Sequence, residues 1–389
     1  MEFRSEIGES STLRFAEAAN QRRAAGKDII SLGLGEPDFE VPRALVDATI
    51  AVLARGASGY SSAMGLPALR ARLAEKLLRE NGIPATPSNI LVTPGAKQAM
   101  QMGLFAVLEP GDEVVVINPS FVSFIPQVYI AEPRATVRVV DVSRADFALP
   151  MDRIAEAMGP RTKVILFNSP NNPAGYVATA DEVRQLVDLA VTHDAYLFSD
   201  EIYEKLVFPG TTHRSPGSYE DAVTRVFTIN GFSKSHAMTG WRLGYLCAPA
   251  RFGDRLLKLQ QHINTNTCTF IQQAMVDAFD ADLSYLGSYA TTLQRRARRV
   301  GEWLTQVPQV SVVAPQAGFF AFVDIGSLGM DSNTFCGRLI EETGVATTPG
   351  IAFGAAWDDH VRLSFAVDDA VLDEGMRRLV GFIQRIAPR

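Results

Sequence analysis

Short runs of bulky apolar residues recur along the chain between segments with helix-like patterns, and they restrict the fold more than any other feature. Six such runs are Ile90–Val92, Glu113–Ile117, Lys163–Phe167, Ala195–Phe198, Arg225–Ile229 and Leu243–Cys247. Most are too apolar for strands with one solvated face, so helices must cover both faces of the sheet that they form. The sequence therefore predicts an open α/β sheet covered by helices.

Two of the intervening segments have clear helical patterns. The first, at 66–81, places leucines at helical spacing on one face, and we expect an ion pair between Glu75 and Arg79. The second begins with a capping box formed by Thr179 and Glu182. Its inward face would consist of Val183, Leu186, Val187 and Ala190.

Composition and charge narrow the class of protein. A chain of 389 residues with 47% hydrophobic residues can bury a large core, and we expect two domains. The net charge of −6 provides no overall basic field for nucleic acid or an anionic membrane. No apolar run approaches the ~18 residues of a membrane span. The main basic cluster is interpreted as a solvated helix face and consists of Arg295, Arg296, Arg298 and Arg299.

The cysteines and the N-terminus indicate a cytoplasmic protein. Cys247, Cys268 and Cys336 are too few and too scattered for a disulfide framework or a zinc site. We interpret them as buried or partly buried thiols in a reducing compartment. The first ten residues, MEFRSEIGES, contain acids and lack the apolar core of a secretory signal.

Polar side chains directly follow four of the predicted strands. These residues are Thr93, Asn168, Asp200 and Asn230. Ligands of open α/β sheets bind beyond the carboxyl ends of the strands, so residues far apart in sequence would meet in one crevice.

The segment GFSKSHAMTGWR at 231–242 combines Lys234 with Arg242. An aldehyde cofactor that carries a phosphate needs a lysine to bond to its carbonyl and fixed donors to hold its phosphate. Pyridoxal 5'-phosphate (PLP) meets both requirements. Taken alone, Lys234 would be interpreted as a solvated surface lysine, and only the residues around it favour a cofactor site.

A second group of residues could complete a phosphate site. Gly95, Ala96 and Lys97 open an amphipathic stretch, and the N-terminus of a helix presents free N–H groups to an anion. We expect these residues to form half of a phosphate cradle, with Ser233 and Arg242 as the other half. An ordinary turn from strand to helix is the alternative.

Seven motifs spread over most of the chain carry a resemblance to a known family. They are GEPDFEVP at 35–42, YSSAMGLPALR at 60–70, VTPGAKQAM at 92–100, NSPNNPAGY at 168–176, SDEIYEKL at 199–206, the lysine segment, and VRLSFA at 361–366. With them the chain resembles the class I/II PLP-dependent aminotransferases of fold type I, in the branch that contains bacterial aspartate and aromatic aminotransferases. The resemblance implies a large PLP-binding domain at 45–290, with a mostly parallel seven-stranded sheet, and a smaller α+β domain built from residues 1–44 and 291–389.

The resemblance also implies roles around the cofactor ring. Asp200 would lie beside the pyridine nitrogen, where an ionised carboxylate keeps the ring protonated and able to accept electrons. Tyr203 and Asn172 would contact the phenolic oxygen. Phe121 stands where many relatives have a stacked tryptophan, and it offers a flat face without an indole donor. From the residues alone, Asp200 as a helix N-cap and Asn172 as a turn residue remain alternatives.

Further residues are implied to bind the substrate or a second subunit. Arg362 resembles the arginine that holds the substrate α-carboxylate, assisted by the Gly35 backbone and by Asn172. Tyr60 would cross a dimer interface to the phosphate in the neighbouring subunit, which implies a homodimer with shared active sites. A surface ion pair for Arg362 and a packing role for Tyr60 are the alternatives. Lys97 matches a position that can approach a side-chain carboxylate, so we favour aspartate or glutamate with 2-oxoglutarate.

The implied reaction moves an amino group from an L-amino acid to a 2-oxo acid by a ping-pong mechanism, with Lys234 as covalent anchor and then as general base. Another PLP-dependent reaction, such as β-elimination, decarboxylation or oxidation in a specialised pathway, stays open because a scaffold does not fix its chemistry. A nicotinamide oxidoreductase is disfavoured because Asp38 replaces the third glycine of a G-x-G-x-x-G motif. A ligand sensor is disfavoured because the enzyme-like pattern begins by about Ile30, which would leave no space for a DNA-binding domain.

Overall fold

The computed structural model describes residues 7–387, and a seven-stranded sheet lies at its centre. The strand order is β2-β8-β7-β6-β5-β3-β4; β8 runs antiparallel to both neighbours, and the other pairs are parallel. The strands are β2 (Ile90–Thr93), β3 (Glu113–Asn118), β4 (Thr136–Asp141), β5 (Thr162–Asn168), β6 (Tyr196–Asp200), β7 (Val226–Gly231) and β8 (Gly244–Cys247). This confirms the predicted α/β fold and all six predicted strands.

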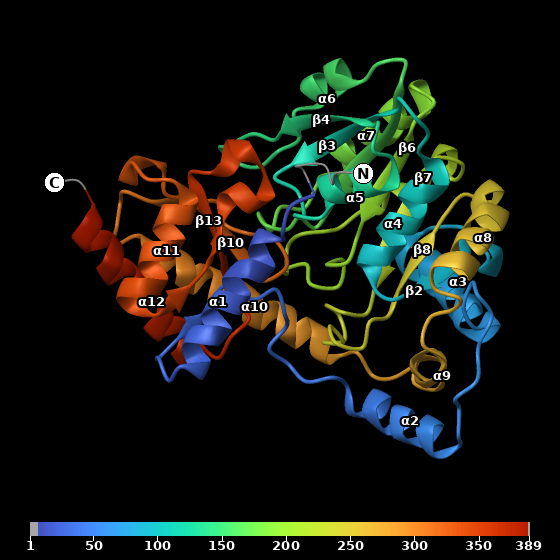
Figure 1. The fold of residues 1–389 in the computed structure, drawn as a ribbon, viewed down its shortest axis with the longest axis horizontal. Coiled ribbons are helices and arrows are strands. Elements are labelled where there is room, and N and C mark those ends of the chain that lie inside the picture. Colours follow the sequence, from blue (N-terminus) through green and yellow to red (C-terminus); the bar gives the residue numbers. More distant parts are fainter. Residues whose placement is uncertain (1–6, 388–389) are drawn as a thin grey trace.

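Helices cover both faces of the central sheet (Figure 1). Leu104 and Val116 belong to the core under one face, which is covered by α4 (Ala96–Val107), α5 (Phe124–Ala131) and α8 (Gly253–Ile263). Leu186 and Ile165 belong to the core under the other face, which is covered by α3 (Pro67–Asn81), α6 (Met151–Ala157) and α7 (Ala180–Thr192).

The remainder of the chain builds a second layered unit beside the sheet (Figure 1). A four-stranded antiparallel sheet has the order β12-β13-β10-β9, and a parallel pair joins β1 to β11. These strands are β1 (Ile30–Ser31), β9 (Ser311–Val312), β10 (Phe320–Asp324), β11 (Val345–Ala346), β12 (Thr348–Pro349) and β13 (His360–Ser364). Their helices are α1 (Ser11–Ala24), α10 (Tyr285–Leu304), α11 (Ser332–Thr343) and α12 (Asp369–Ile386).

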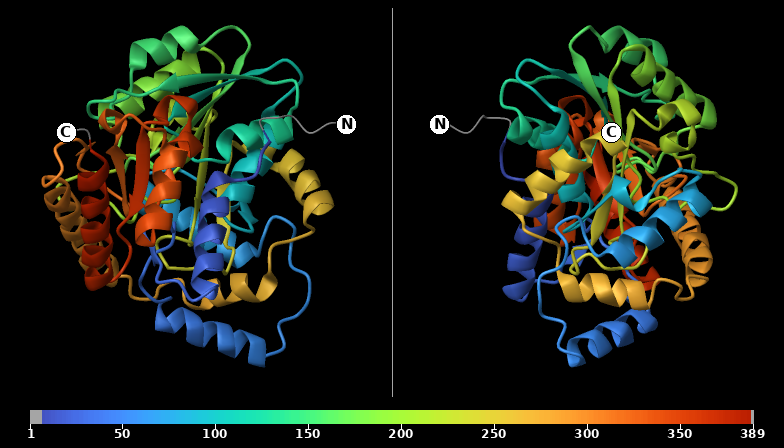
Figure 2. Two further views of the ribbon diagram at one scale, coloured as in Figure 1. Left: turned by 60° about the vertical axis from the view of Figure 1, so that its left-hand side comes forward. Right: turned by 90° about the vertical axis from the view of Figure 1, so that its right-hand side faces the viewer.

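Two helices lie apart from these layers. α2 (Arg43–Ala54) extends from the body of the molecule, and α9 (Thr269–Asp277) packs alongside it in every view (Figures 1 and 2). The α2 side chains Ile50 and Leu53 are more than half exposed. No helix between residues 7 and 387 is both long and apolar enough to cross a membrane.

The structure corrects the expected pairing on α3. Glu75 pairs with Arg72 at 3.0 Å, and Arg79 pairs with Glu80 at 2.8 Å, so the predicted Glu75–Arg79 pair does not form. These ion pairs are exposed and have similarly small free energies, so helical spacing alone does not predict which of them forms. The capping box of α7 is confirmed, because the Glu182 N–H donates to Thr179 Oγ1 at 3.2 Å.

Two other predictions also need correction. Cys247 and Cys336 are buried, but Cys268 is exposed at the start of α9. Arg296 is only 7% exposed, so it does not belong to a solvated face. It forms ion pairs with Asp38 and Asp369, which supply the charge that a buried guanidinium requires.

Candidate active site

A cavity of about 410 Å³ opens at the carboxyl ends of β5 and β6, between the central sheet and the second unit. Most of the predicted site residues line it, namely Gly35, Ala96, Lys97, Phe121, Asn172, Asp200, Tyr203, Ser233, Lys234, Arg242 and Arg362. Gly95 adjoins Arg242 just behind this lining. Tyr60 lies elsewhere and is 89% exposed. The sheet therefore brings together residues from distant parts of the sequence, as its topology predicts.

Lys234 lies in the loop after β7, and its ammonium donates a hydrogen bond to the Gly35 carbonyl. Burial lowers the pKa of its amine to about 8, although the carboxylate of Glu36 opposes this shift. A lysine with this pKa has a substantial unprotonated fraction near neutral pH. Such an amine can act as a nucleophile or as a base.

Asp200 ends β6, and Tyr203 follows on the next turn. The Asp200 carboxylate is buried and accepts a hydrogen bond from the Ile202 N–H at 3.2 Å. Burial raises the pKa of Asp200 to about 7, and it also raises the pKa of the buried Tyr203 hydroxyl. A cationic partner would therefore favour the ionised form of Asp200.

Arg362 lies on β13 and is 4% exposed. Its Nη1 donates to Asn172 Oδ1 at 2.9 Å, and its Nη2 donates to the Gly33 carbonyl at 2.9 Å. No carboxylate within the described residues pairs with it, and burial lowers its pKa to about 10. The guanidinium lies 4.1 Å from the centre of the Phe320 ring, which limits its movement. A buried cation without an anion is well suited to bind a carboxylate.

The expected anion cradle is assembled where α4 begins. Gly95 has a φ of 85° and approaches Arg242 so closely that a Cβ at Gly95 would lie 2.3 Å from Nη2. The guanidinium of Arg242 is held by the carbonyls of Thr239 at 2.8 Å and Pro94 at 3.2 Å. Arg242 itself has a φ of 56°, a left-handed conformation that is strained for a residue with a side chain. Ser233 is buried and lines the same cavity.

Lys97 lies on the same side of the cavity, and its ammonium is 5.3 Å from the centre of the Phe121 ring. Burial, and then the nearby charge of Arg242, lower the pKa of Lys97. No carboxylate between residues 7 and 387 forms an ion pair with it. The cavity thus has a second cation, in addition to Arg362, that is free to meet an anionic ligand.

Several residues of this cavity were not predicted from the sequence. Ser10, Thr12 and Leu13 contribute from the start of α1, and Thr239 contributes from the loop before Arg242. Asn168 was expected only to follow a strand, yet its Nδ2 donates to the Asp200 carbonyl at 2.8 Å. The position of Asn168 at a strand end could have identified it, whereas α1 has no sequence signal that ties it to the sheet.

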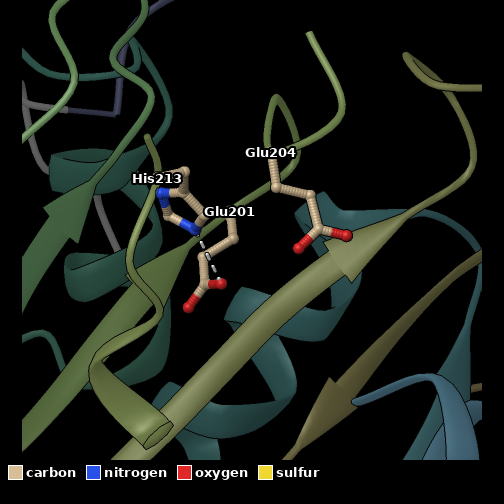
Figure 3. A group of neighbouring side chains, drawn as sticks. All are labelled: Glu201, Glu204 and His213. Carbon is tan, nitrogen blue, oxygen red and sulfur yellow. Dashed lines mark hydrogen bonds and ion pairs between the residues drawn. The ribbon is translucent and has the colours of Figure 1, made fainter. Parts of the chain in front are cut away.

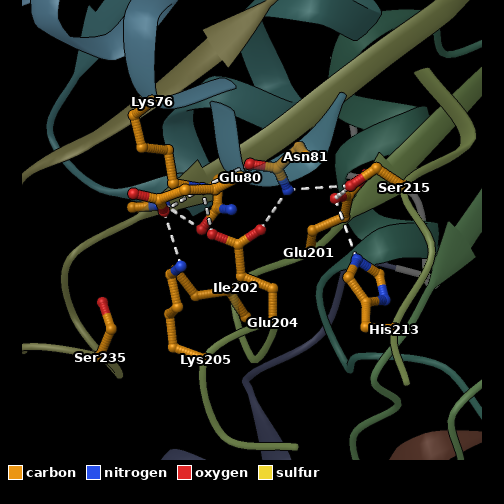
Figure 4. A network of polar contacts seen from close by, with 12 residues as sticks. Lys76, Glu80, Asn81, Glu201, Ile202, Glu204, Lys205, His213, Ser215 and Ser235 are labelled. Atoms are coloured by element: carbon orange, nitrogen blue, oxygen red, sulfur yellow. Dashed lines mark hydrogen bonds and ion pairs between the residues drawn. The ribbon is translucent and has the colours of Figure 1, made fainter. Parts of the chain in front are cut away.

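A buried polar network holds the turn after β6 from behind the site. His213 Nε2 lies 3.1 Å from the Glu201 carboxylate (Figure 3), and Ser215 Oγ donates to the same carboxylate at 2.5 Å (Figure 4). Glu204 contacts the ammonium of Lys76 on α3 (Figure 4). Burial opposes ionisation of Glu204, but the Lys76 charge and its neighbours outweigh it and lower the pKa to about 2. The turn that carries Tyr203 is therefore anchored on both sides.

Three side chains in this network, Glu201, Glu204 and His213, have ligand atoms within 4.8 Å of one another. This spacing would suit a metal ion. However, the Lys76 ammonium already forms an ion pair with the Glu204 carboxylate, and it would repel a metal ion. His213 Nδ1 has no partner among the described residues, and it points away from both carboxylates (Figure 3). We interpret the group as an ion-pair network.

Comparison with known proteins identifies the family. The model of the family "Aminotransferase class I and II" matches residues 27–379. The chain belongs to this family. The class I and II aminotransferases are PLP-dependent, and this chain is a PLP-dependent aminotransferase with the fold type I architecture. This confirms the predicted family, cofactor and reaction.

Individual aminotransferases resemble the chain over nearly all of its length. An aspartate aminotransferase of Pyrococcus abyssi is 38% identical over 92% of each protein. An aspartate/prephenate aminotransferase of Thermus thermophilus is 36% identical, covering 97% of this chain and 96% of the relative. A solved structure of aspartate aminotransferase from Thermus thermophilus with maleate has a TM-score of 0.92 and 36% identity, over 98% of this chain and all of the other.

The cavity also fits PLP on its own geometry. Lys234, whose pKa burial lowers, lies on one wall, and the buried Asp200 lies near the end of β6. A Cβ at Gly95 would clash with the Arg242 guanidinium, so the glycine lets this cation lie beside the start of α4, where both could bind a phosphate. These residues match an aldehyde, a ring nitrogen and a phosphate, the three groups by which the cofactor is held.

Proposed function

We propose that this aminotransferase acts on dicarboxylic substrates, with aspartate or glutamate as donor and 2-oxoglutarate as acceptor. This proposal is supported by two cations, Arg362 and Lys97, which lie at different places in one cavity and have no ion-pair partner among the described residues. Two such groups can bind the two carboxylates of one substrate. The names of relatives, which include aspartate aminotransferases from several organisms, agree with this proposal.

The proposed roles of the cavity residues follow from their chemistry. PLP, when bound, supplies an aldehyde for the substrate amine and an electron sink for the substrate Cα. Lys234 would hold the cofactor covalently, and its freed amine would take the proton from the substrate Cα and deliver it to the cofactor carbon that carried the aldehyde. A pKa of about 8 allows both roles near neutral pH.

Asp200, Tyr203, Asn172 and Phe121 are proposed to hold the ring. Asp200 would accept a hydrogen bond from the protonated ring nitrogen. This cationic partner would keep the carboxylate ionised, although burial raises the pKa of Asp200 to about 7. Tyr203 and Asn172 donate to the phenolic oxygen. Phe121 covers the ring with a flat apolar face and excludes water from it.

Two groups are proposed to bind anions. Gly95, Ala96 and the backbone N–H of Lys97 at the N-terminus of α4 hold the cofactor phosphate, together with the Ser233 hydroxyl and the Arg242 guanidinium. The substrate α-carboxylate is proposed to bind the Arg362 guanidinium, which Asn172 Oδ1 orients. The Gly35 backbone is proposed to assist in binding this carboxylate.

The substrate class is tested by replacing Lys97 with methionine, which keeps the length of the side chain and removes its charge. Loss of one charge-assisted contact should lower kcat/KM for L-aspartate by about 10- to 100-fold. The value for L-phenylalanine should change by less than about 3-fold, because its ring needs no cation. Steady-state kinetics with both donors measure this difference. Equal losses for the two donors would instead assign Lys97 to cofactor binding. If the wild-type enzyme were active with neither donor, dicarboxylic transamination would be rejected.

We further propose a homodimer in which Tyr60 reaches the phosphate bound by the partner subunit. Tyr60 is 89% exposed, and the apolar side chains Ile50 and Leu53 on the extended α2 are more than half exposed. Exposure of this kind is common at surfaces that another subunit covers.

Replacement of Tyr60 by phenylalanine should weaken PLP binding by about 10-fold, since one hydrogen bond to a charged group is lost. Cofactor titration measures the affinity, and analytical ultracentrifugation measures the assembly. A monomer that binds PLP as tightly as the wild type would contradict both the dimer and the role of Tyr60.

We also propose that the large domain spans 45–290 and that the small domain combines 1–44 with 291–389. The central sheet, from β2 to β8, lies within the first range, and all the strands of the smaller sheets lie within the second. α10 begins at Tyr285, so this helix crosses the proposed boundary. We propose a cytoplasmic location because the three cysteines are free thiols, and thiols stay reduced in the cytosol.

A further inference from the structure

Residues 33–36 form one wall of the cavity and contact both of its central cations. The Gly33 carbonyl accepts from Arg362 at 2.9 Å, and the Gly35 carbonyl accepts from Lys234. The Glu36 carboxylate also raises the pKa of Lys234, against the larger effect of burial. A shift of this wall would therefore be felt by the residues that are proposed to bind substrate and cofactor.

The wall is held mainly at its Gly33 end, where Thr348 Oγ1 also donates to the Gly33 carbonyl at 3.3 Å. At one end, the Leu32 N–H donates to the Ala346 carbonyl at 2.8 Å, and Leu32 accepts from the Ser364 N–H at 2.6 Å. Residues 34–37, by contrast, make no backbone-to-backbone hydrogen bond with any residue between 7 and 387. The position of the wall must then depend on what fixes its far end.

Asp38 fixes that end to α10. Its carboxylate accepts from Tyr289 Oη at 2.7 Å and from Arg296 Nη1 at 2.7 Å. The next residue, Phe39, packs its ring against those of Tyr289 and Tyr285, at 4.3 and 5.4 Å between ring centres. This anchor combines two charge-assisted contacts with an aromatic contact, and its arginine is nearly fully buried.

Arg296 is itself fixed from another direction. Its Nε donates to Asp369 Oδ1, at the start of α12, at 2.8 Å. Asp369 does not touch residues 33–36, although it shares the same guanidinium with Asp38. The two carboxylates thus both neutralise the charge of the buried Arg296 guanidinium, but only Asp38 is attached to the cavity wall.

We infer that Asp38 is a positioning residue for substrate binding. Through Arg296 and Tyr289 it holds the Gly33 and Gly35 carbonyls in place, and the Gly33 carbonyl in turn aims the Arg362 guanidinium at the substrate carboxylate. This inference depends on the proposed role of Arg362. Its consequence is a change in KM and in ligand affinity, with chemistry on bound substrate largely preserved.

The test compares Asp38→Asn with Asp369→Asn in the PLP-loaded enzyme. Each variant removes one negative charge from Arg296. Asp38→Asn should raise KM for L-aspartate by about 10-fold, with kcat within about 2-fold, and should weaken binding of maleate, a non-reacting dicarboxylate, by a similar factor. Asp369→Asn should leave KM and maleate affinity within about 2-fold. Calorimetry and steady-state kinetics give the two values, and thermal unfolding checks that both variants remain folded.

The other outcomes would have distinct meanings. Equal changes in KM for the two variants would show that the ion pairs only stabilise the fold, and no change in either would overturn the inference directly. Arg362→Lys is measured in parallel. If it raises KM while Asp38→Asn does not, only the positioning role fails. If Arg362→Lys has no effect on KM, the proposed carboxylate site fails and the positioning role fails with it.

Discussion

Replacing Lys234 with alanine is expected to abolish covalent attachment of PLP and to lower kcat by about 10⁴-fold, because the same amine serves as anchor and as base. Borohydride reduction followed by mass spectrometry measures the attachment, and single-turnover kinetics measure the remaining rate. The wild-type protein should gain the mass of reduced cofactor, and the variant should not.

Lys97→Ala provides the matched control, since this lysine lines the same cavity. It should keep the cofactor mass on Lys234. A variant at Lys234 that retains the covalent cofactor or full turnover would overturn the assignment.

The pH dependence of cofactor capture gives a further check on Lys234. Only the unprotonated amine attacks an aldehyde, and the pKa of this amine is lowered to about 8. Uptake of PLP by the apoprotein should therefore accelerate as the pH rises towards 8 and level off above it. An exposed lysine would continue to accelerate up to its ordinary pKa near 10.4.

Replacing Arg362 with alanine should lower kcat/KM by about 10³-fold, or about 4 kcal/mol, because two charge-assisted hydrogen bonds to the substrate are lost. Most of the loss should lie in KM. Arg362→Lys keeps a positive charge but lacks the planar fork, so it should recover only part of the activity. Kinetics with a series of L-amino acid donors provide the measurement.

The result for Arg362 should be the same for every donor, since all share the α-carboxylate. A loss confined to aspartate and glutamate would instead place Arg362 at the side-chain carboxylate. The absorption spectrum of bound PLP should be retained in Arg362→Ala, which separates substrate binding from cofactor binding.

The central sheet could be predicted because its strands are buried on both faces. Apolar runs such as 90–92 and 163–167 have few alternatives to a covered sheet, and both are strands. The strand β4 was not predicted. It lies at the edge of the sheet, and Thr136, Arg138 and Val139 on it are exposed, so it lacks the continuous apolar pattern of the others. The number of strands was expected only from family resemblance.

The candidate site could be predicted to a similar extent, and for a physical reason. Asp200 and Asn168 stand at strand ends, where the topology of the sheet decides which residues meet. The anchor between Asp38 and Arg296 could not be predicted, because it joins residues 258 positions apart through side-chain packing. A cluster of arginines on a helix has the same pattern whether one of them is buried or all are solvated.

Ser10, Thr12 and Leu13 belong to the wall of the cavity, and this affects how the protein should be handled. A segment fused directly ahead of them is delivered close to this cavity, where it can obstruct substrates or alter which amino acids are accepted. The end of α12 lies away from the start of α1 (Figure 1). Purification handles, surface attachment and fusion partners therefore belong after Ile386.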